Sequence, residues 1–148
     1  MKHPPRLMAV RIAGPMILDI DWSTGETLTL DLSGWVTPPF DALSDPDFFA
    51  RPERDDWGHG IAWPGGLDLG ADLLYEKCRE QAGMPTAKAF DEWMTRNGLS
   101  LATAAETLGM TRRMIAHYRS GSRPIPKIVG LACTGWELER TAKSGRPE

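Results

Sequence analysis

The sequence predicts an α+β protein, with a small β-rich N-terminal domain at residues 1–82 and an all-α domain at residues 83–148. Strand-like apolar runs lie in the first half, and apolar residues at helical spacing dominate the second. The charge also changes sign. Residues 1–80 hold seven Lys/Arg and fourteen Asp/Glu, a net charge of −7, whereas residues 81–148 hold ten and six, a net charge of +4. We therefore expect two functional units, of which only the second suits a polyanionic partner.

Three strands are expected at the start of the chain. Residues 7–12 are a short apolar run, and residues 16–22 and 27–32 follow it. In the third run leucines alternate with polar residues, which is the period of a strand with one buried face. Because Gly25 can adopt a positive φ in the short connection, the second and third runs are expected to pair as a hairpin.

The rest of the acidic half is expected to contain one more strand and one helix. The strand is predicted over residues 55–63, stopped by the turn sequence Pro64-Gly65-Gly66. The helix is predicted over residues 71–81, with Asp68 or the residues just after it as the N-cap. Gly83-Met84-Pro85 is then the expected boundary between the domains.

The basic half begins and ends with longer helices. Apolar residues at i, i+1, i+4 and i+5 predict a helix after Pro85 that ends at Asn97-Gly98. A last helix is predicted from Pro126 to near Thr141, with one face formed by Ile128, Leu131, Ala132 and Gly135.

Two short helices are predicted between them. Ser100 is a natural N-cap for residues 101–108, and Thr111 is one for residues 112–120. A steep crossing of two helices needs a small residue at the contact and an unstrained residue in the turn, which Ala105 and Gly109 supply. The residues expected to fill the wedge between the helices are Leu108, Met110, Ile115 and Tyr118.

This spacing resembles the phage-repressor (Cro and Xre-like) helix-turn-helix, and with the flanking helices the resemblance covers about residues 87–139. It implies a lambda-repressor-like fold and double-stranded DNA as the partner. Two positions depart from the family pattern. Leu101 stands where the family favours a Gln that contacts DNA, and Arg119 replaces a frequent Glu.

The acidic half resembles a second family. Its motifs occur in the order Gly25-Glu26, Leu30-Asp31-Leu32-Ser33, Phe40-x-x-Leu43-x-Asp45-Pro46-x-x-Phe49, Ile61-x-Trp63-Pro64-x-Gly66-x-Asp68 and Leu74-Tyr75. This order is similar to that of the short bacterial β-rich proteins catalogued as domain of unknown function 2442. The resemblance implies a β-rich fold and no particular chemistry. Small members are often encoded beside toxin-like partners, so it also implies an antitoxin-type role as an alternative.

The predicted helix over residues 112–120 carries the candidate DNA contacts. With Ile115 and Tyr118 turned inward, steps of about 100° place Arg113 and His117 on the opposite face. Residues 112–127 hold five cations and no acidic residue. Because arginine binds guanine bidentately and cations also bind phosphates, we assign base contacts to Arg112, Arg113 and His117. DNA-backbone contacts are assigned to Ser100, Thr111, Arg119, Arg123 and Lys127.

Other functional classes lack support in the sequence. No nucleophile elbow, phosphate-binding glycine loop or Cys–His pair with an orienting group occurs, so we expect no enzyme activity and no cofactor. The histidines have no second ligand at metal spacing, so no metal is expected. No apolar run approaches 18 residues, so no membrane span is expected. Two isolated cysteines, Cys78 and Cys133, fit a reducing cytoplasm.

The sequence thus predicts a cytoplasmic, sequence-specific DNA-binding transcriptional regulator of bacterial type. One helix-turn-helix reads only one half-site, so we expect a two-fold homodimer on a near-palindromic operator. The dimer contact is open between the β-rich domain and the last helix. The alternative is an adaptor or antitoxin-like protein whose N-terminal domain binds a protein partner. A helix-turn-helix reused for protein contacts is open as well.

Overall fold

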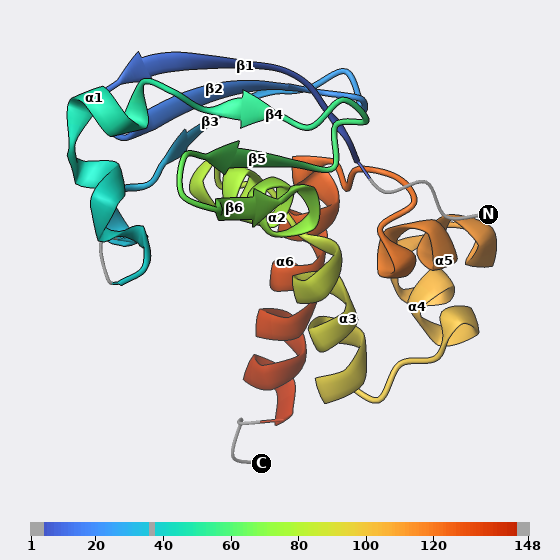
Figure 1. The fold of residues 1–148 in the computed structure, drawn as a ribbon. Helices are drawn as coiled ribbons and strands as arrows, with labels where there is room; N and C mark the ends of the chain where they lie inside the picture. The colour runs from blue at the N-terminus through green and yellow to red at the C-terminus, as the bar shows by residue number, and fades with distance from the viewer. Residues whose placement is uncertain (1–4, 36–37, 145–148) are drawn as a thin grey trace. The chain divides into compact units, whose positions relative to one another are not determined.

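The computed structural model describes residues 5–35 and 38–144, which form two units, residues 5–82 and residues 83–144. Figure 1 shows strands in the first unit, coloured blue to green, and helices in the second, coloured yellow-green to red. The predicted α+β class, with N-terminal sheets and C-terminal helices, is therefore confirmed. Among the residues described, no helix has both the length and the apolarity that crossing a bilayer requires.

The N-terminal unit is built on two antiparallel sheets of three strands each. The first sheet has the order β1 (Leu7–Gly14), β2 (Ile17–Trp22) and β3 (Thr27–Asp31). The second sheet has the order β4 (Glu53–Arg54), β5 (Gly60–Trp63) and β6 (Leu67–Gly70). In both sheets, strands that are consecutive in the sequence are neighbours.

The predicted hairpin between β2 and β3 is present. Leu18 pairs with Leu30 and Ile20 with Leu28, and Gly25 adopts a φ of 92° in the connection. Leu18, Ile20 and Leu30 are buried, so the alternation in the sequence marks the face that packs on the core.

The prediction of one strand over residues 55–63 is wrong. Residues 56–58 form a turn, in which the Asp55 carboxylate accepts hydrogen bonds from the backbone N–H groups of Trp57 and His59. Only Gly60–Trp63 is extended, and it pairs with β6, which the sequence analysis missed. Gly65 and Gly66 both have positive φ, so the sequence Pro64-Gly65-Gly66 reverses the chain rather than ending the sheet.

Helix α2 (Ala71–Gln81) has the predicted bounds, and its N-cap is one of the residues just after Asp68, as predicted. Gly70 is the N-cap and makes no side-chain capping bond, while Asp68 lies within β6. The connection between the sheets contains three short helices, η1 (Ser33–Trp35), η2 (Phe40–Ser44) and α1 (Pro46–Phe49).

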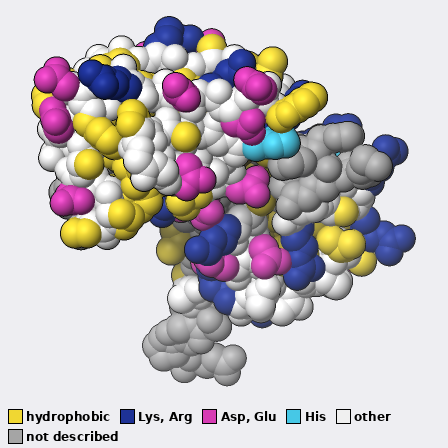
Figure 2. Space-filling model, in the orientation of Figure 1, with side chains coloured by type: hydrophobic (Ala, Val, Ile, Leu, Met, Phe, Trp, Pro, Cys, Tyr) yellow, Lys and Arg dark blue, Asp and Glu magenta, His cyan; other side chains and the backbone are white. Residues whose placement is uncertain are grey.

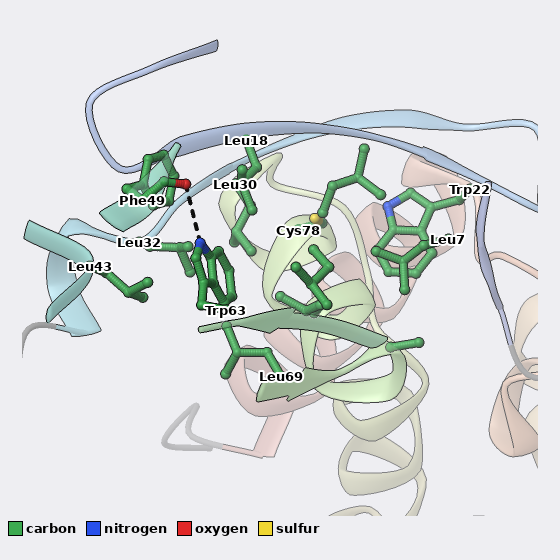
Figure 3. Close-up of a cluster of buried hydrophobic side chains, with 14 residues drawn as sticks. Leu7, Leu18, Trp22, Leu30, Leu32, Leu43, Phe49, Trp63, Leu69 and Cys78 are labelled. Atoms are coloured by element: carbon green, nitrogen blue, oxygen red, sulfur yellow. Dashed lines mark hydrogen bonds between the residues drawn. The ribbon is translucent and has the colours of Figure 1, made fainter. Parts of the chain in front are cut away.

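The core of the N-terminal unit takes side chains from both sheets, from α2 and from the short helices. Figure 3 shows Leu18, Leu30 and Cys78 between Trp22 on one side and Trp63 on the other. The indole Nε1 of Trp63 donates a hydrogen bond to the backbone oxygen of Phe49 at 3.2 Å. This bond satisfies a polar group that would otherwise be buried without a partner.

The C-terminal unit consists of four helices, α3 (Ala87–Arg96), α4 (Leu101–Leu108), α5 (Arg112–Ser120) and α6 (Lys127–Ser144). Side-chain caps begin the first three, because the hydroxyls of Thr86, Ser100 and Thr111 each accept a backbone N–H bond. The core contains Phe90, Trp93, Met94, Ala104, Ile115, Tyr118, Ile125, Val129 and Cys133.

Helix α6 buries a different face from the one that the sequence analysis grouped together. Val129 and Cys133 pack into the core, whereas Ile128 and Leu131 are 74% and 63% exposed. Gly130 lies against Pro85, and a Cβ at this position would be only 2.5 Å from the Pro85 Cγ. Helix α6 therefore packs against Pro85 at a position where any residue larger than glycine would force the two segments apart.

Candidate nucleic-acid interface

The connection between α4 and α5 has the geometry that the sequence spacing predicts for this turn. Gly109 ends α4 with a left-handed backbone, φ 67° and ψ 37°. The N–H of Met110 then donates to the Ala105 carbonyl oxygen at 2.9 Å, and the Thr111 hydroxyl accepts from the Met114 N–H at 3.1 Å. A left-handed residue followed two positions later by the N-cap of the next helix fixes the direction in which α5 leaves the turn.

The residues assigned to helix packing lie in or against the core of the C-terminal unit. Ala105, Ile115 and Tyr118 are buried, and Leu108 and Met110 are half-buried against the same cluster. The ring of Tyr118 meets that of Phe90 edge-on at 5.9 Å between centroids. One face of α5 is thus held inward, while Arg113 and Ser120 on the other side of the helix are exposed.

The three residues assigned to base contacts differ in accessibility. Arg112 and Arg113 are exposed at the start of α5, and neither makes an ion pair with any residue that the structure describes. His117 is only half-exposed, and its Nε2 is buried with no hydrogen-bond partner within the described chain. The structure therefore presents both arginines fully, but it presents only part of the imidazole.

The five residues assigned to the DNA backbone fall into two groups. Arg123 and Lys127 are exposed beyond α5. The other three already serve the fold. Ser100 is in a capping box with Thr103, the Thr111 hydroxyl caps α5, and Arg119 binds a carboxylate. The Ser100 hydroxyl also lies 3.0 Å from the Thr103 hydroxyl, whereas the Thr111 hydroxyl accepts its capping bond and keeps its own O–H to donate.

Asp91 was missed in the sequence analysis, although it holds one of the candidate residues. Arg119 Nε donates to Asp91 Oδ1 at 2.6 Å, and the side chains are 40% and 49% exposed. The contact links α5 to α3 across 28 residues of sequence. No local pattern signals a pairing at that separation, so only the packing of α3 against α5 reveals it.

The charge on the two units follows the division seen in the sequence. Figure 2 shows Asp and Glu side chains distributed over the visible face of the N-terminal unit and several Lys and Arg side chains on the C-terminal unit. Helix α5 carries three arginines and no carboxylate. A helix of this kind attracts phosphates over a range set by the salt concentration.

A second cluster of charged residues lies in the N-terminal unit. The Glu26 carboxylate accepts hydrogen bonds from Arg79 Nη1 at 2.7 Å, from the Thr24 hydroxyl at 2.7 Å and from the Tyr75 hydroxyl. Glu26 and Arg79 form an ion pair whose side chains are 21% and 3% exposed. The cluster joins the β2–β3 connection to α2 and brings together Gly25-Glu26 and Leu74-Tyr75, two of the recognised motifs.

The environment of this cluster shifts two pKa values. Burial raises the pKa of Glu26, but the hydrogen bonds from Tyr75, Thr24 and Arg79 outweigh it, so the net pKa lies below the usual value. Burial, followed by the hydrogen bond to Glu26, raises the pKa of Tyr75. The residues therefore form a charged, satisfied network that anchors α2.

Within the described chain, no group of His, Cys, Asp or Glu is placed to hold a metal ion.

Comparison with known proteins gives two findings. The family described as "Protein of unknown function (DUF2442)" matches residues 7–80, which confirms the resemblance of the N-terminal half. The chain is also similar to a solved crystal structure from Nitrosomonas europaea ATCC 19718, of a protein named "Putative DNA Binding Protein". The identity is 38%, the match covers 99% of this chain and 96% of that chain, and the TM-score is 0.75. No curated protein matches the chain.

Proposed function

The chain belongs to the DUF2442 family, whose description assigns no function. We propose, from the residues of the chain itself, that it is a cytoplasmic, sequence-specific DNA-binding transcriptional regulator of bacterial type. The observation that carries this proposal is the outward face of α5. Arg112 and Arg113 are exposed at its start, Ile115 and Tyr118 hold its other face inward, and the helix has no carboxylate.

We further propose that residues 83–148 form a lambda-repressor-like helix-turn-helix domain and residues 1–82 a separate β-rich domain. The turn at Gly109, the burial of Ala105 and the cap at Thr111 support the first part. The name of the similar protein from Nitrosomonas europaea also supports DNA as the partner. In such a domain the second helix of the motif enters the major groove with its N-terminal residues against the base edges.

The contacts then divide by chemistry. Arg112 and Arg113 would meet base edges at the start of α5, with part of the imidazole of His117 beside them. Arg123 and Lys127, which are exposed beyond α5, would bind phosphates, which position the protein without reading sequence. The net charge of −7 on residues 1–80 would be repelled by DNA, so we assign dimerisation or partner binding to that half. No catalytic step is part of this proposal.

The test is binding of the full-length chain to a library of duplex DNA fragments at several salt concentrations. A regulator of this kind enriches a small set of sequences, and its affinity falls as the salt concentration rises, because bound cations release counterions from the phosphates. Equal affinity for every fragment would contradict sequence-specific regulation.

A two-fold dimer is expected, because one module contacts only one half-site and half-sites on one face of the duplex lie about 10 base pairs apart. Sedimentation of the full chain at micromolar concentration should give twice the monomer mass of 16.4 kDa. Two variants distinguish the open alternatives for the contact, Leu131→Glu on α6 and Ile12→Glu on β1, since both side chains are exposed. A monomeric wild-type chain would remove the dimer from the proposal.

One observation favours the alternative of an adaptor or antitoxin-like protein. Strand β1 is at the end of its sheet, and it exposes the apolar side chains of Met8 and Ile12. Strands at a sheet edge can pair with an extended segment of another protein. If this role holds, the full chain should capture a protein partner from a bacterial lysate, and Met8→Lys/Ile12→Lys should lose it. Capture unchanged in that variant, or no capture by the wild type, would count against the adaptor.

A further inference from the structure

We propose that α5 is a guanine reader: Arg112 and Arg113 are its specificity-determining residues, and the preferred duplex carries G·C pairs where these side chains reach. The inference rests on the proposed DNA-binding function and deepens it by naming the base that is read. It follows from two observations. Arg112 and Arg113 have no ion-pair partner in the described chain, and α5 carries no Asn, Gln, Asp or Glu that could read another base.

The first step concerns the arginines of α5. The third one, Arg119, is near the C-terminal end of the helix, and its Nε is bound to Asp91 at 2.6 Å. Arg112 and Arg113 lie at the N-terminal end, are exposed, and have no ion-pair partner in the part of the chain that the structure describes. Only these two guanidinium groups of the helix are therefore free at the end that enters the groove.

The second step concerns the geometry of recognition. A guanidinium group presents two parallel N–H donors, and guanine presents O6 and N7 as two acceptors in the major groove. Adenine presents one donor and one acceptor, so it cannot satisfy both N–H groups of an arginine. An uncommitted arginine at a base edge therefore favours guanine over adenine by its donor pattern alone.

The third step concerns the side chains that would read other bases. Asn and Gln are the bidentate partners of adenine, and residues 98–148 contain neither. The nearest candidate, Asn97, uses its side-chain amide on the Trp93 carbonyl oxygen and on Glu137. Asp and Glu, which accept from cytosine, are absent from α5. The arginines are thus the only bidentate base readers that the helix carries.

The experiment uses the full-length chain and duplexes selected from a random library. Each guanine of the preferred duplex is replaced in turn by 7-deazaguanine, which keeps the base pair and removes the N7 acceptor. We expect binding to weaken about 10-fold at the guanines that the arginines reach, because one of the two hydrogen bonds of the contact is lost while the bond to O6 remains. Replacement elsewhere in the duplex should have little effect.

Conservative variants connect this effect to particular side chains. Arg112→Lys and Arg113→Lys keep the charge but lose the planar pair of donors. Each should reduce the sensitivity to 7-deazaguanine at its own position, while the dependence of affinity on salt stays the same. Arg123→Lys, a matched change outside α5, should leave the sensitivity unchanged. Circular dichroism melting of each variant checks that the exposed substitutions leave the fold intact.

The outcomes separate the two proposals. Selective binding that is unaffected by 7-deazaguanine, or sensitivity that persists when Arg112 and Arg113 are both replaced by alanine, overturns the guanine reader and leaves the regulator standing. Salt-dependent binding without any sequence preference, or no binding to duplex DNA, overturns the regulator and the guanine reader together. Loss at discrete guanines that disappears in one lysine variant supports both.

Discussion

Replacing Arg112 and Arg113 together by alanine is expected to remove sequence-selective DNA binding and to leave the C-terminal unit folded. Both side chains are exposed, and the core residues of α5 are Ile115 and Tyr118. Each bidentate contact contributes about 1–3 kcal/mol of discrimination, so the preference for the best duplex should fall by about 2–6 kcal/mol. Neither arginine is assigned to a phosphate, so the slope of log affinity against log salt should change little.

The measurement is a salt titration of binding to a preferred duplex and to an unrelated one. Lys127→Ala is the matched control, since Lys127 is exposed beyond α5 and is assigned to a phosphate. It should weaken both duplexes equally and lower the slope by about 1. A double arginine variant with the full preference of the wild type would show that α5 does not read bases.

Replacing Glu26 by alanine is expected to destabilise the N-terminal unit by about 3–5 kcal/mol, because it removes one partner of a buried ion pair. The Arg79 side chain is only 3% exposed, so its charge loses a close partner in a site where it is poorly hydrated. Urea unfolding followed by tryptophan fluorescence measures the loss, since Trp22 meets Tyr75 of the same cluster at 5.0 Å between ring centroids. Unchanged stability at pH 7 would show that the cluster does not anchor α2.

The matched control is Arg11→Ala, which breaks the ion pair between Arg11 and Asp21 on the solvent side of the first sheet. Both of these side chains are well exposed, so their attraction is screened by water and salt, and the loss of stability should be small. Comparison of the two variants separates the effect of burial from that of simply removing one charge from the N-terminal unit.

The contribution of Glu26 also has a defined pH dependence. Its pKa in the folded chain lies below the usual value, so the unfolded chain binds a proton more readily at mildly acidic pH. Its stabilising effect is therefore fully present above the ordinary glutamate pKa, near 4.5, and is lost as the pH falls through the folded pKa. The difference in unfolding free energy between wild type and Glu26→Gln should accordingly be largest above about pH 5 and shrink below pH 4.5.

The helical half could be predicted closely because its signals are local. Caps at Ser100 and Thr111 are contacts within one turn of helix, and Gly109 and Gly121 both end a helix with positive φ. In the β-rich half, the turn around Gly58 could not be predicted from nearby residues. A Cβ at Gly58 would overlap the Leu7 carbonyl oxygen, so the need for glycine there arises from a strand that lies about fifty residues earlier.

The sequence by itself determined the type of most elements, the opposite charges of the halves, and the position of Arg112 and Arg113 at the start of a helix. These follow from periodicity, caps and composition, which act over a few residues. Only the tertiary structure decided which groups are free to act. It pairs Arg119 with Asp91, buries Nε2 of His117 and brings Arg79 to Glu26 across 53 residues. Such contacts depend on distances set by packing, and spacing along the chain does not encode those distances.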